Sequence, residues 1–183
     1  MLKNAVRVGS MLVLGGLAAC SGAGPYGHAR TYVETDAERG YVARAEEPVY
    51  DEVRRMPEQY QGRLLTFFGV VTDVAPGPEG TLRVALQQRT HQERHLCEDE
   101  SDGTCRVTIN ARDGGPLTAV LSLRGEDRDG ERRLQQNSLV RVFGSVTPGE
   151  YDANGGPVLR VEWYRHWPRG EYVTTQSAGV MRR

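Results

Sequence analysis

The fold of this chain is decided by the stretch Tyr60-Gln61-Gly62-Arg63-Leu64-Leu65-Thr66-Phe67-Phe68-Gly69-Val70-Val71. The same design returns in Asn137-Ser138-Leu139-Val140-Arg141-Val142-Phe143-Gly144-Ser145-Val146. Each stretch begins with a polar or glycine turn, continues as an alternating strand, and contains one glycine before a valine exit. Because glycine has no Cβ, it lets a strand bend or bulge sharply. We therefore predict strands over 64–74 and 139–146, coiled at Gly69 and Gly144.

Three further segments have the alternation or the β-branched content of strands, at 81–88, 105–111 and 158–164. In the last of these, Leu159, Val161 and Trp163 are expected on one face, opposite Tyr164. The apolar segment 117–123 fits either a strand or a short helix.

A short helix is predicted over 48–56, with Pro48 in its first turn and Pro57 after its end. Its expected apolar face contains Val49, Val53 and Met56. The globular domain is therefore expected to begin near residue 48.

These pieces resemble the oligonucleotide/oligosaccharide-binding (OB) fold, whose first and fourth strands often carry the turn, strand and glycine pattern described above. The resemblance covers about residues 48–165, and the chain is also similar to small bacterial envelope lipoproteins with an OB-like domain. It implies a mainly β fold, a small OB-like barrel of five or six strands preceded by a short helix. Segment 112–138 holds a helix in OB domains, but residues 125–131 have the composition of a solvated turn here. Whether the segment contains a helix or an extra strand therefore stays open, and so does a β-sandwich.

Composition excludes several classes of protein. The 183 residues include 22 glycines, and 23 basic residues face 24 acidic ones, for a formal net charge of -1. This balance provides no broad positive field for nucleic-acid binding, so no nucleic-acid partner is expected. A coiled coil, a collagen and a polytopic membrane protein are excluded as well.

The beginning of the chain has the pattern of a signal peptide. Lys3 and Arg7 precede an apolar run that is too short to span a bilayer. The run ends in Leu17-Ala18-Ala19-Cys20, which resembles the lipobox of bacterial lipoproteins. The resemblance implies removal of residues 1–19, palmitate-type acylation at Cys20 and firm attachment to a membrane. Because Ser21 follows the cysteine, the analogy favours the outer membrane, facing the periplasm.

The remaining chain divides into three parts by composition. Residues 20–47 are predicted to be the lipidated cysteine and a flexible tether, because they contain small and polar residues without a sustained period. Residues 48–173 form the predicted barrel domain, and residues 174–183 a disordered tail.

Two cysteines and two histidines lie close together in the sequence. Cys97 and Cys105 flank a polar loop, and in an oxidising envelope they are expected to form a disulfide. The alternative adds His91 and His95 as ligands, which gives a metal-binding envelope lipoprotein with free thiolates.

A segment near the C-terminus concentrates aromatic and arginine side chains, which are typical of contact surfaces. The predicted partner or ligand patch consists of Trp163, Tyr164, Arg165, Trp167, Arg169 and Tyr172. The alternative is that this segment folds back and covers the end of the barrel. Four arginines, one on each of four strands, are predicted to point outward as solubilising charges: Arg83, Arg106, Arg141 and Arg160.

The chain shows no phosphate-binding glycine loop, metalloprotease helix or nucleophile elbow. His166 has no base or nucleophile partner that the sequence identifies. We therefore predict no catalytic residues, no cofactor and no enzyme activity. The expected function is a lipid-anchored binding or structural module with an envelope protein or glycan as its partner.

Overall fold

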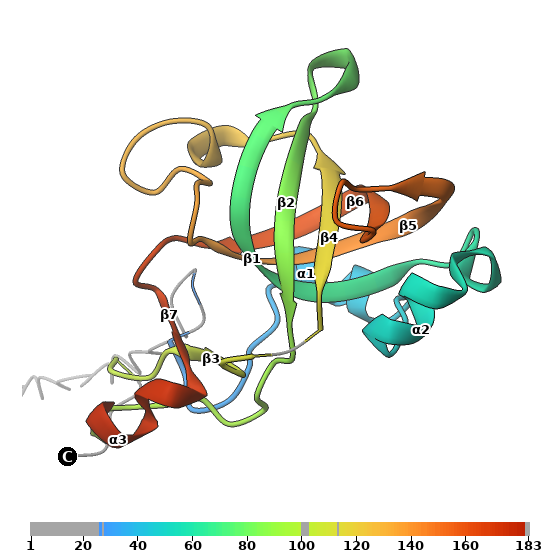
Figure 1. The fold of residues 1–183 in the computed structure, drawn as a ribbon. Helices are drawn as coiled ribbons and strands as arrows, with labels where there is room; N and C mark the ends of the chain where they lie inside the picture. Colours follow the sequence, from blue (N-terminus) through green and yellow to red (C-terminus); the bar gives the residue numbers. More distant parts are fainter. Residues whose placement is uncertain (1–25, 27, 100–102, 113, 182–183) are drawn as a thin grey trace, which may run out of the picture.

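The computed structural model describes residue 26 and residues 28–99, 103–112 and 114–181 (Figure 1). The predicted signal peptide and Cys20 lie outside the described residues. The protein is mainly β, with a five-stranded mixed sheet and a separate two-stranded sheet. No helix among the described residues is long and apolar enough to cross a membrane.

The main sheet closes on itself. Its strands follow the order β1-β2-β4-β6-β5, and β5 pairs again with β1, so the strands form a closed barrel. All neighbours are antiparallel except β4 and β6, which are parallel. The barrel strands are β1 (Leu65–Pro76), β2 (Leu82–Arg89), β4 (Pro116–Leu121), β5 (Leu139–Tyr151) and β6 (Pro157–Trp167).

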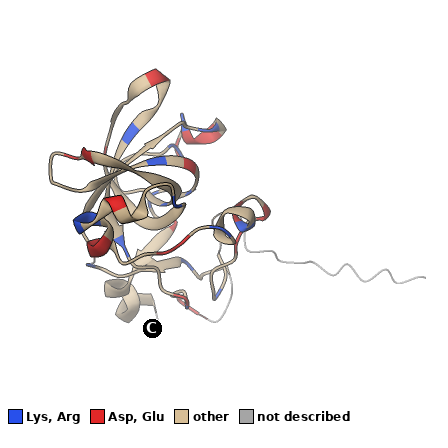
Figure 2. Ribbon diagram, turned by 90° about the vertical axis from the view of Figure 1, so that its right-hand side faces the viewer, with Lys and Arg blue, Asp and Glu red and all other residues tan. Residues whose placement is uncertain are grey.

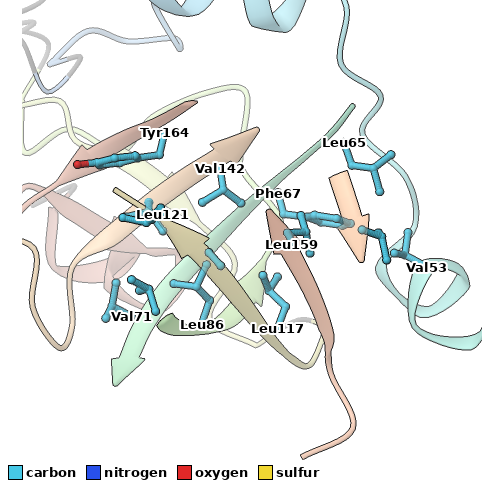
Figure 3. Close-up of a cluster of buried hydrophobic side chains, with 14 of the residues drawn as sticks. Val53, Leu65, Phe67, Val71, Leu86, Leu117, Leu121, Val142, Leu159 and Tyr164 are labelled. Carbon is cyan, nitrogen blue, oxygen red and sulfur yellow. The ribbon is translucent and has the colours of Figure 1, made fainter. Parts of the chain in front are cut away.

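The barrel interior is filled by alternate residues of these strands (Figure 3). In β2, Val84 and Leu86 are buried, as their alternation with polar neighbours predicts. Leu117, Leu121 and Leu159 come from β4 and β6 into the same cluster. Closure of the sheet satisfies the edges that an open sheet would leave unpaired.

The two glycines of the deciding stretches have different roles. At Gly144 the register with β6 shifts, because Glu162 is an extra residue between the partners Trp163 and Val161. A Cβ at Gly144 would collide with the carbonyl oxygen of Arg160. Of the bulge or sharp coil expected at Gly69, the bulge is wrong: pairing continues through Gly69, and the irregularity of β1 lies between Val71 and Asp73. Gly69 instead allows a close approach, because a Cβ there would lie 2.9 Å from the Cβ of Leu86.

The Glu162 bulge also corrects the predicted faces of β6. Leu159 and Tyr164 both lie in the interior cluster, although strict alternation places them on opposite faces. Trp163 lies outside, stacked on Tyr41. One extra residue in a strand moves every following side chain to the other face.

The predicted third barrel strand at 105–111 is wrong. Only β3 (Val107–Ile109) forms there, and it pairs in parallel with β7 (Tyr172–Thr174), outside the barrel. The third barrel strand is β4, within the segment that fitted either a strand or a helix. The chain between β4 and β5 then has only a short 3-10 turn, η3 (Gly125–Asp127).

The predicted helix before the barrel is confirmed as α2 (Tyr50–Arg55), followed by the 3-10 turn η1 (Pro57–Tyr60). Its predicted apolar face is wrong in part. Tyr50 and Val53 are buried against the barrel core, whereas Val49 is 61% exposed and Met56 is 37% exposed. The helix begins at Tyr50, so the buried pair is spaced three residues apart on one face.

The tether interpretation is wrong for residues 28–47. Helix α1 (Asp36–Val42) begins with a capping box in which Thr35 and Glu38 bond to each other's backbone. His28, which is expected in a solvated linker, bonds through Nε2 to Glu171 at 2.8 Å. This segment is folded onto the barrel.

The expected disordered tail is also wrong for the residues that the structure describes there. After β7 the chain forms the 3-10 turn η4 (Thr175–Ser177) and helix α3 (Ala178–Met181). In Figure 1, β3, β7 and α3 lie together beside one end of the barrel.

A second hydrophobic cluster lies on the outer face of the barrel. It consists of Phe68, Val107, Ile109, Leu139 and Trp167, with Tyr26, Tyr32, Val70 and Tyr172 packed against it. Its members come from barrel strands, from the β3–β7 pair and from the N-terminal segment. We call this cluster and the segments around it the outer layer.

Candidate functional site

Glu38 is the centre of a buried charge network on the outer layer. Its side chain is fully buried and accepts hydrogen bonds from two arginines. Arg141 Nη1 lies 3.0 Å from Oε1, and Arg165 Nη1 lies 2.9 Å from Oε2. The Tyr32 hydroxyl also donates to Oε1. With His91 and His95, these residues form what we call the Glu38 cluster.

Secondary structure places each charge of the network. Arg141 and Arg165 are direct partners across the β5–β6 ladder, so both project from the same outer face of the barrel. The capping box at the start of α1 holds Glu38 above them. The prediction that Arg141 is a solubilising charge is therefore wrong, because the N-terminal segment covers it and leaves only 7% exposed. Arg160 is exposed, as predicted, and Arg83 and Arg106 are half-buried.

Aromatic rings enclose the two guanidinium groups. Arg141 lies 5.3 Å from the centre of the Tyr32 ring and 5.0 Å from that of Phe68. Arg165 lies 4.7 Å from the centre of the Trp167 ring. At these distances the ring faces attract the cations, which offsets part of the cost of removing two guanidiniums from water.

His91 and His95 face each other beside this network. Their Nε2 atoms are 3.2 Å apart, and His95 Nδ1 lies 2.8 Å from the carbonyl oxygen of Ala29. Burial, the neighbouring His95 and then Arg141 lower the pKa of His91 to about 3. Burial also lowers the pKa of His95, although its bond to Ala29 opposes the change. Both imidazoles are therefore neutral at pH 7.

A cavity of about 400 Å³ opens beside the cluster. It is lined by Thr31, Tyr32, Glu34, Glu47, Phe68, His91, Glu93 and Arg141. Three carboxylates, one guanidinium and one imidazole therefore line the same space. Such a concave site with converging polar groups is able to hold a small ligand or ion.

The two cysteines form the predicted disulfide. Cys97 and Cys105 are bonded, with their Cα atoms 4.0 Å apart. The four-ligand metal set with free thiolates is therefore wrong, because both sulfur atoms are used in the bond. Within the part of the chain that the structure describes, no group of three or more His, Cys, Asp or Glu side chains is arranged around a metal position.

The C-terminal aromatic segment is mostly buried. Trp167 is fully buried, and Tyr164 and Arg165 are 2% and 5% exposed, so the predicted surface patch is wrong for these three residues. The alternative that the segment covers the end of the barrel is wrong for them as well, because all three belong to β6, which is a strand of the barrel wall. Trp163 and Tyr172 remain half-buried, and Arg169 is exposed.

The structure gives His166 partners that the sequence does not reveal. His166 Nδ1 lies 2.7 Å from Asp127 Oδ1, and Nε2 lies 3.1 Å from the Ser138 hydroxyl. The Tyr164 hydroxyl donates to Asp127 Oδ2 at 2.6 Å. Asp127, Ser138 and His166, the His166 triad, come from the turn η3, the residue before β5 and the strand β6, and no spacing in the sequence connects them.

The His166 triad has the residue types of a hydrolytic centre, but Ser138 is fully buried and also accepts a hydrogen bond from the Gln135 amide. A nucleophile must reach its substrate, and this hydroxyl is enclosed. The arrangement instead holds the chain between β4 and β5 against the barrel. Burial acts to raise the pKa of Asp127, but the hydrogen bonds from His166 and Tyr164 hold this pKa below its ordinary value.

No protein-family model matches this chain, and a search of curated proteins finds no match. Its function is therefore argued from its own residues.

Proposed function

We propose that the chain is a lipid-anchored protein of the bacterial cell envelope whose OB-like barrel acts as a non-catalytic binding or structural module. The observation that carries the proposal is the agreement of the charged start, the short apolar run and the box Leu17-Ala18-Ala19-Cys20. The Cys97–Cys105 disulfide supports an exported protein, because such bonds persist in oxidising compartments.

Strand order supports the OB-like part of the proposal. Counted along the chain, the fourth barrel strand, β5, returns to lie beside the first, β1, and β2 and β4 continue the sheet on the other side. This is a Greek-key arrangement in a five-stranded barrel, which is also the arrangement of the OB fold.

A half-exposed group around Trp163 supports the binding role. Trp163 stacks on Tyr41 with ring centres 5.5 Å apart. Arg44 lies 5.3 Å from the Tyr41 ring centre, and Arg124 lies 5.0 Å from that of Trp163. Tryptophan, tyrosine and arginine contribute most to binding energy at protein interfaces. We therefore place the partner contact, with an envelope protein or glycan, at this Trp163 face.

The balance of basic and acidic residues is the reason that no nucleic acid is proposed as a partner. Removal of residues 1–19 takes away Lys3 and Arg7 and no acid, which leaves 21 basic and 24 acidic residues. Basic and acidic positions are interspersed along the ribbon in Figure 2. A mixed surface of this kind favours solubility over polyanion binding.

The anchor is tested by expressing the full-length gene in a Gram-negative host and measuring the intact mass of the membrane-bound protein. We expect cleavage before Cys20, the added mass of two or three acyl chains, and separation with the outer membrane. A Cys20→Ser variant is the matched control and is expected to lack both the acyl mass and the cleavage. A wild-type protein that is soluble and carries no lipid contradicts the proposal.

The binding role is tested by placing a photo-crosslinking amino acid at Trp163 or, as a control, at the exposed Tyr151 in intact cells. We expect an adduct at Trp163 and none at Tyr151. A discrete heavier band indicates a protein partner and a ladder indicates a glycan. Equal adducts at both positions, or none at either, contradict a contact at the Trp163 face.

A further inference from the structure

We propose that His91 and His95 bind a divalent transition-metal ion of the Zn²⁺ or Cu²⁺ type, beside the cavity that His91 lines. The inference does not rest on the lipid anchor or on the Trp163 face. It also differs from the thiolate set, because the cysteine sulfurs are joined to each other.

The separation of the two imidazole nitrogens supports the site. A tetrahedral ion with metal–nitrogen bonds of about 2.0–2.1 Å holds two ligand nitrogens roughly 3.3 Å apart. His91 Nε2 and His95 Nε2 are 3.2 Å apart. The two rings are close to perpendicular, with an angle of 86° between their planes.

Hydrogen bonding fixes which nitrogen of His95 is available. The carbonyl oxygen of Ala29 can only accept, so His95 Nδ1 carries the proton and Nε2 of the neutral ring has a free lone pair. Histidines that ligate metals commonly donate their other N–H to a backbone carbonyl in this way. Without metal, His91 Nε2–H donates to that lone pair. When metal binds, His91 gives up this proton and takes one from solvent at Nδ1, so no net proton is released.

The cavity provides charge and room for the ion. Glu34, Glu47 and Glu93 line it together with His91, and Arg141 is the one guanidinium in its lining. Arg141 is bonded to Glu38 at 3.0 Å, but its charge still acts on His91 and lowers the pKa of that imidazole. The excess of carboxylates attracts a cation. With the two imidazoles as ligands, solvent oxygens complete the coordination, because no third His, Cys, Asp or Glu among the described residues is grouped with them.

The test is isothermal titration of the purified full-length chain in detergent with Zn²⁺, after thiol titration has verified that the disulfide is intact. We expect one equivalent of Zn²⁺ to bind. His91→Gln and His95→Gln are expected to weaken this binding by more than about tenfold. His28→Gln is the control, because His28 bonds to Glu171 and does not line the cavity. The control is expected to bind as the wild type does.

Because the His95 ring is buried, His95→Gln is checked for folding by circular dichroism, and if it does not fold His91→Gln alone decides. A second measurement uses Cu²⁺ and electron paramagnetic resonance, which is expected to show hyperfine splitting from two imidazole nitrogens. The proposal is overturned if the wild type binds no Zn²⁺ up to about 1 mM, or if His91→Gln binds as tightly as the wild type. Cu²⁺ spectra that are identical in wild type and His91→Gln also overturn it.

Discussion

The interior of the barrel and the outer layer are both buried, but they are built in different ways. The interior is filled by alternate apolar residues of the barrel strands, such as Val84 and Leu86 of β2. The outer layer surrounds a charged centre, in which Glu38 meets Arg141 and Arg165 from strands far along the chain. Burial in the interior follows from a two-residue period, whereas burial in the outer layer depends on one segment covering another.

The difference has an energetic consequence. An apolar interior loses stability in proportion to the volume that is removed. A buried ion network loses most when one member is removed, because the remaining charges stay buried without compensation. The following predictions separate these two behaviours.

The largest effect is expected from Glu38→Ala. This change leaves the guanidiniums of Arg141 and Arg165 buried without their shared carboxylate, and we expect a loss of about 3–5 kcal/mol in the free energy of unfolding. Urea denaturation measures it. Glu46→Ala is the matched control, since Glu46 pairs with Arg63 at an exposed position and its loss is expected to change little. Equal effects of the two variants would show that the Glu38 network is not buried in solution.

Leu117→Ala tests the interior. Leu117 is fully buried in the barrel cluster, and its truncation is expected to cost about 2–5 kcal/mol through lost packing and a cavity. Because Leu117 lies in the interior cluster and the partners of Glu38 lie in the outer layer, the double variant is expected to lose the sum of the two single losses within about 0.5 kcal/mol. A strong departure from additivity, measured by the same urea transitions, would mean that the two regions unfold as one coupled unit.

The same comparison explains how much of the fold the sequence predicts. Alternation correctly predicts β2 and the deciding stretches, because one face of each strand meets the interior. It also places Arg141 correctly on the side away from the interior. A side chain that points away from the barrel interior is still shielded from solvent here, because residues 28–47 cover that face. Composition alone predicts a tether for this segment, so the cover could not be foreseen.

The candidate site is harder to predict for the same reason. His91 and His95 are visible as a pair in the sequence. The tautomer of His95, however, is fixed by its hydrogen bond to the carbonyl oxygen of Ala29, a residue that is distant in the sequence. The partners of His166 come from separate segments. Tyr164 enters the interior because Glu162 is a bulge, and no pattern in a single strand reveals that shift. A local period carries no information about tertiary contacts of this kind.

A smaller effect is expected from the disulfide, which lies in the outer layer. The bond closes a short loop, with eight residues of sequence separation between its cysteines. The double variant Cys97→Ser with Cys105→Ser is expected to lose about 2–3 kcal/mol in the free energy of unfolding, mainly because the unfolded chain gains conformational entropy without the bond. Hydrogen exchange is expected to rise in β3 and β7 and to stay unchanged in β2. Faster exchange throughout the barrel would contradict the separation of the two regions.

The smallest effect is expected from Asp127→Asn, in the His166 triad at the barrel end. The folded-state pKa of Asp127 is held below its ordinary value of 3.8, so the ionised carboxylate stabilises the fold above that pH. The contribution disappears as pH falls through the lower folded-state pKa.

At pH 7 the variant is therefore expected to be less stable than the wild type by roughly 1 kcal/mol, through weaker hydrogen bonds to His166 and Tyr164. Near pH 3 the difference is expected to shrink, and urea transitions from pH 7 to pH 3 measure it. A difference in stability that stays constant with pH would mean that the protonated and the ionised carboxyl of Asp127 hold these partners equally well. Because the triad joins η3 and the residue before β5 to β6, such a result would assign its contribution to packing of the β4–β5 connection against the barrel, and the ionised carboxylate would have no separate role.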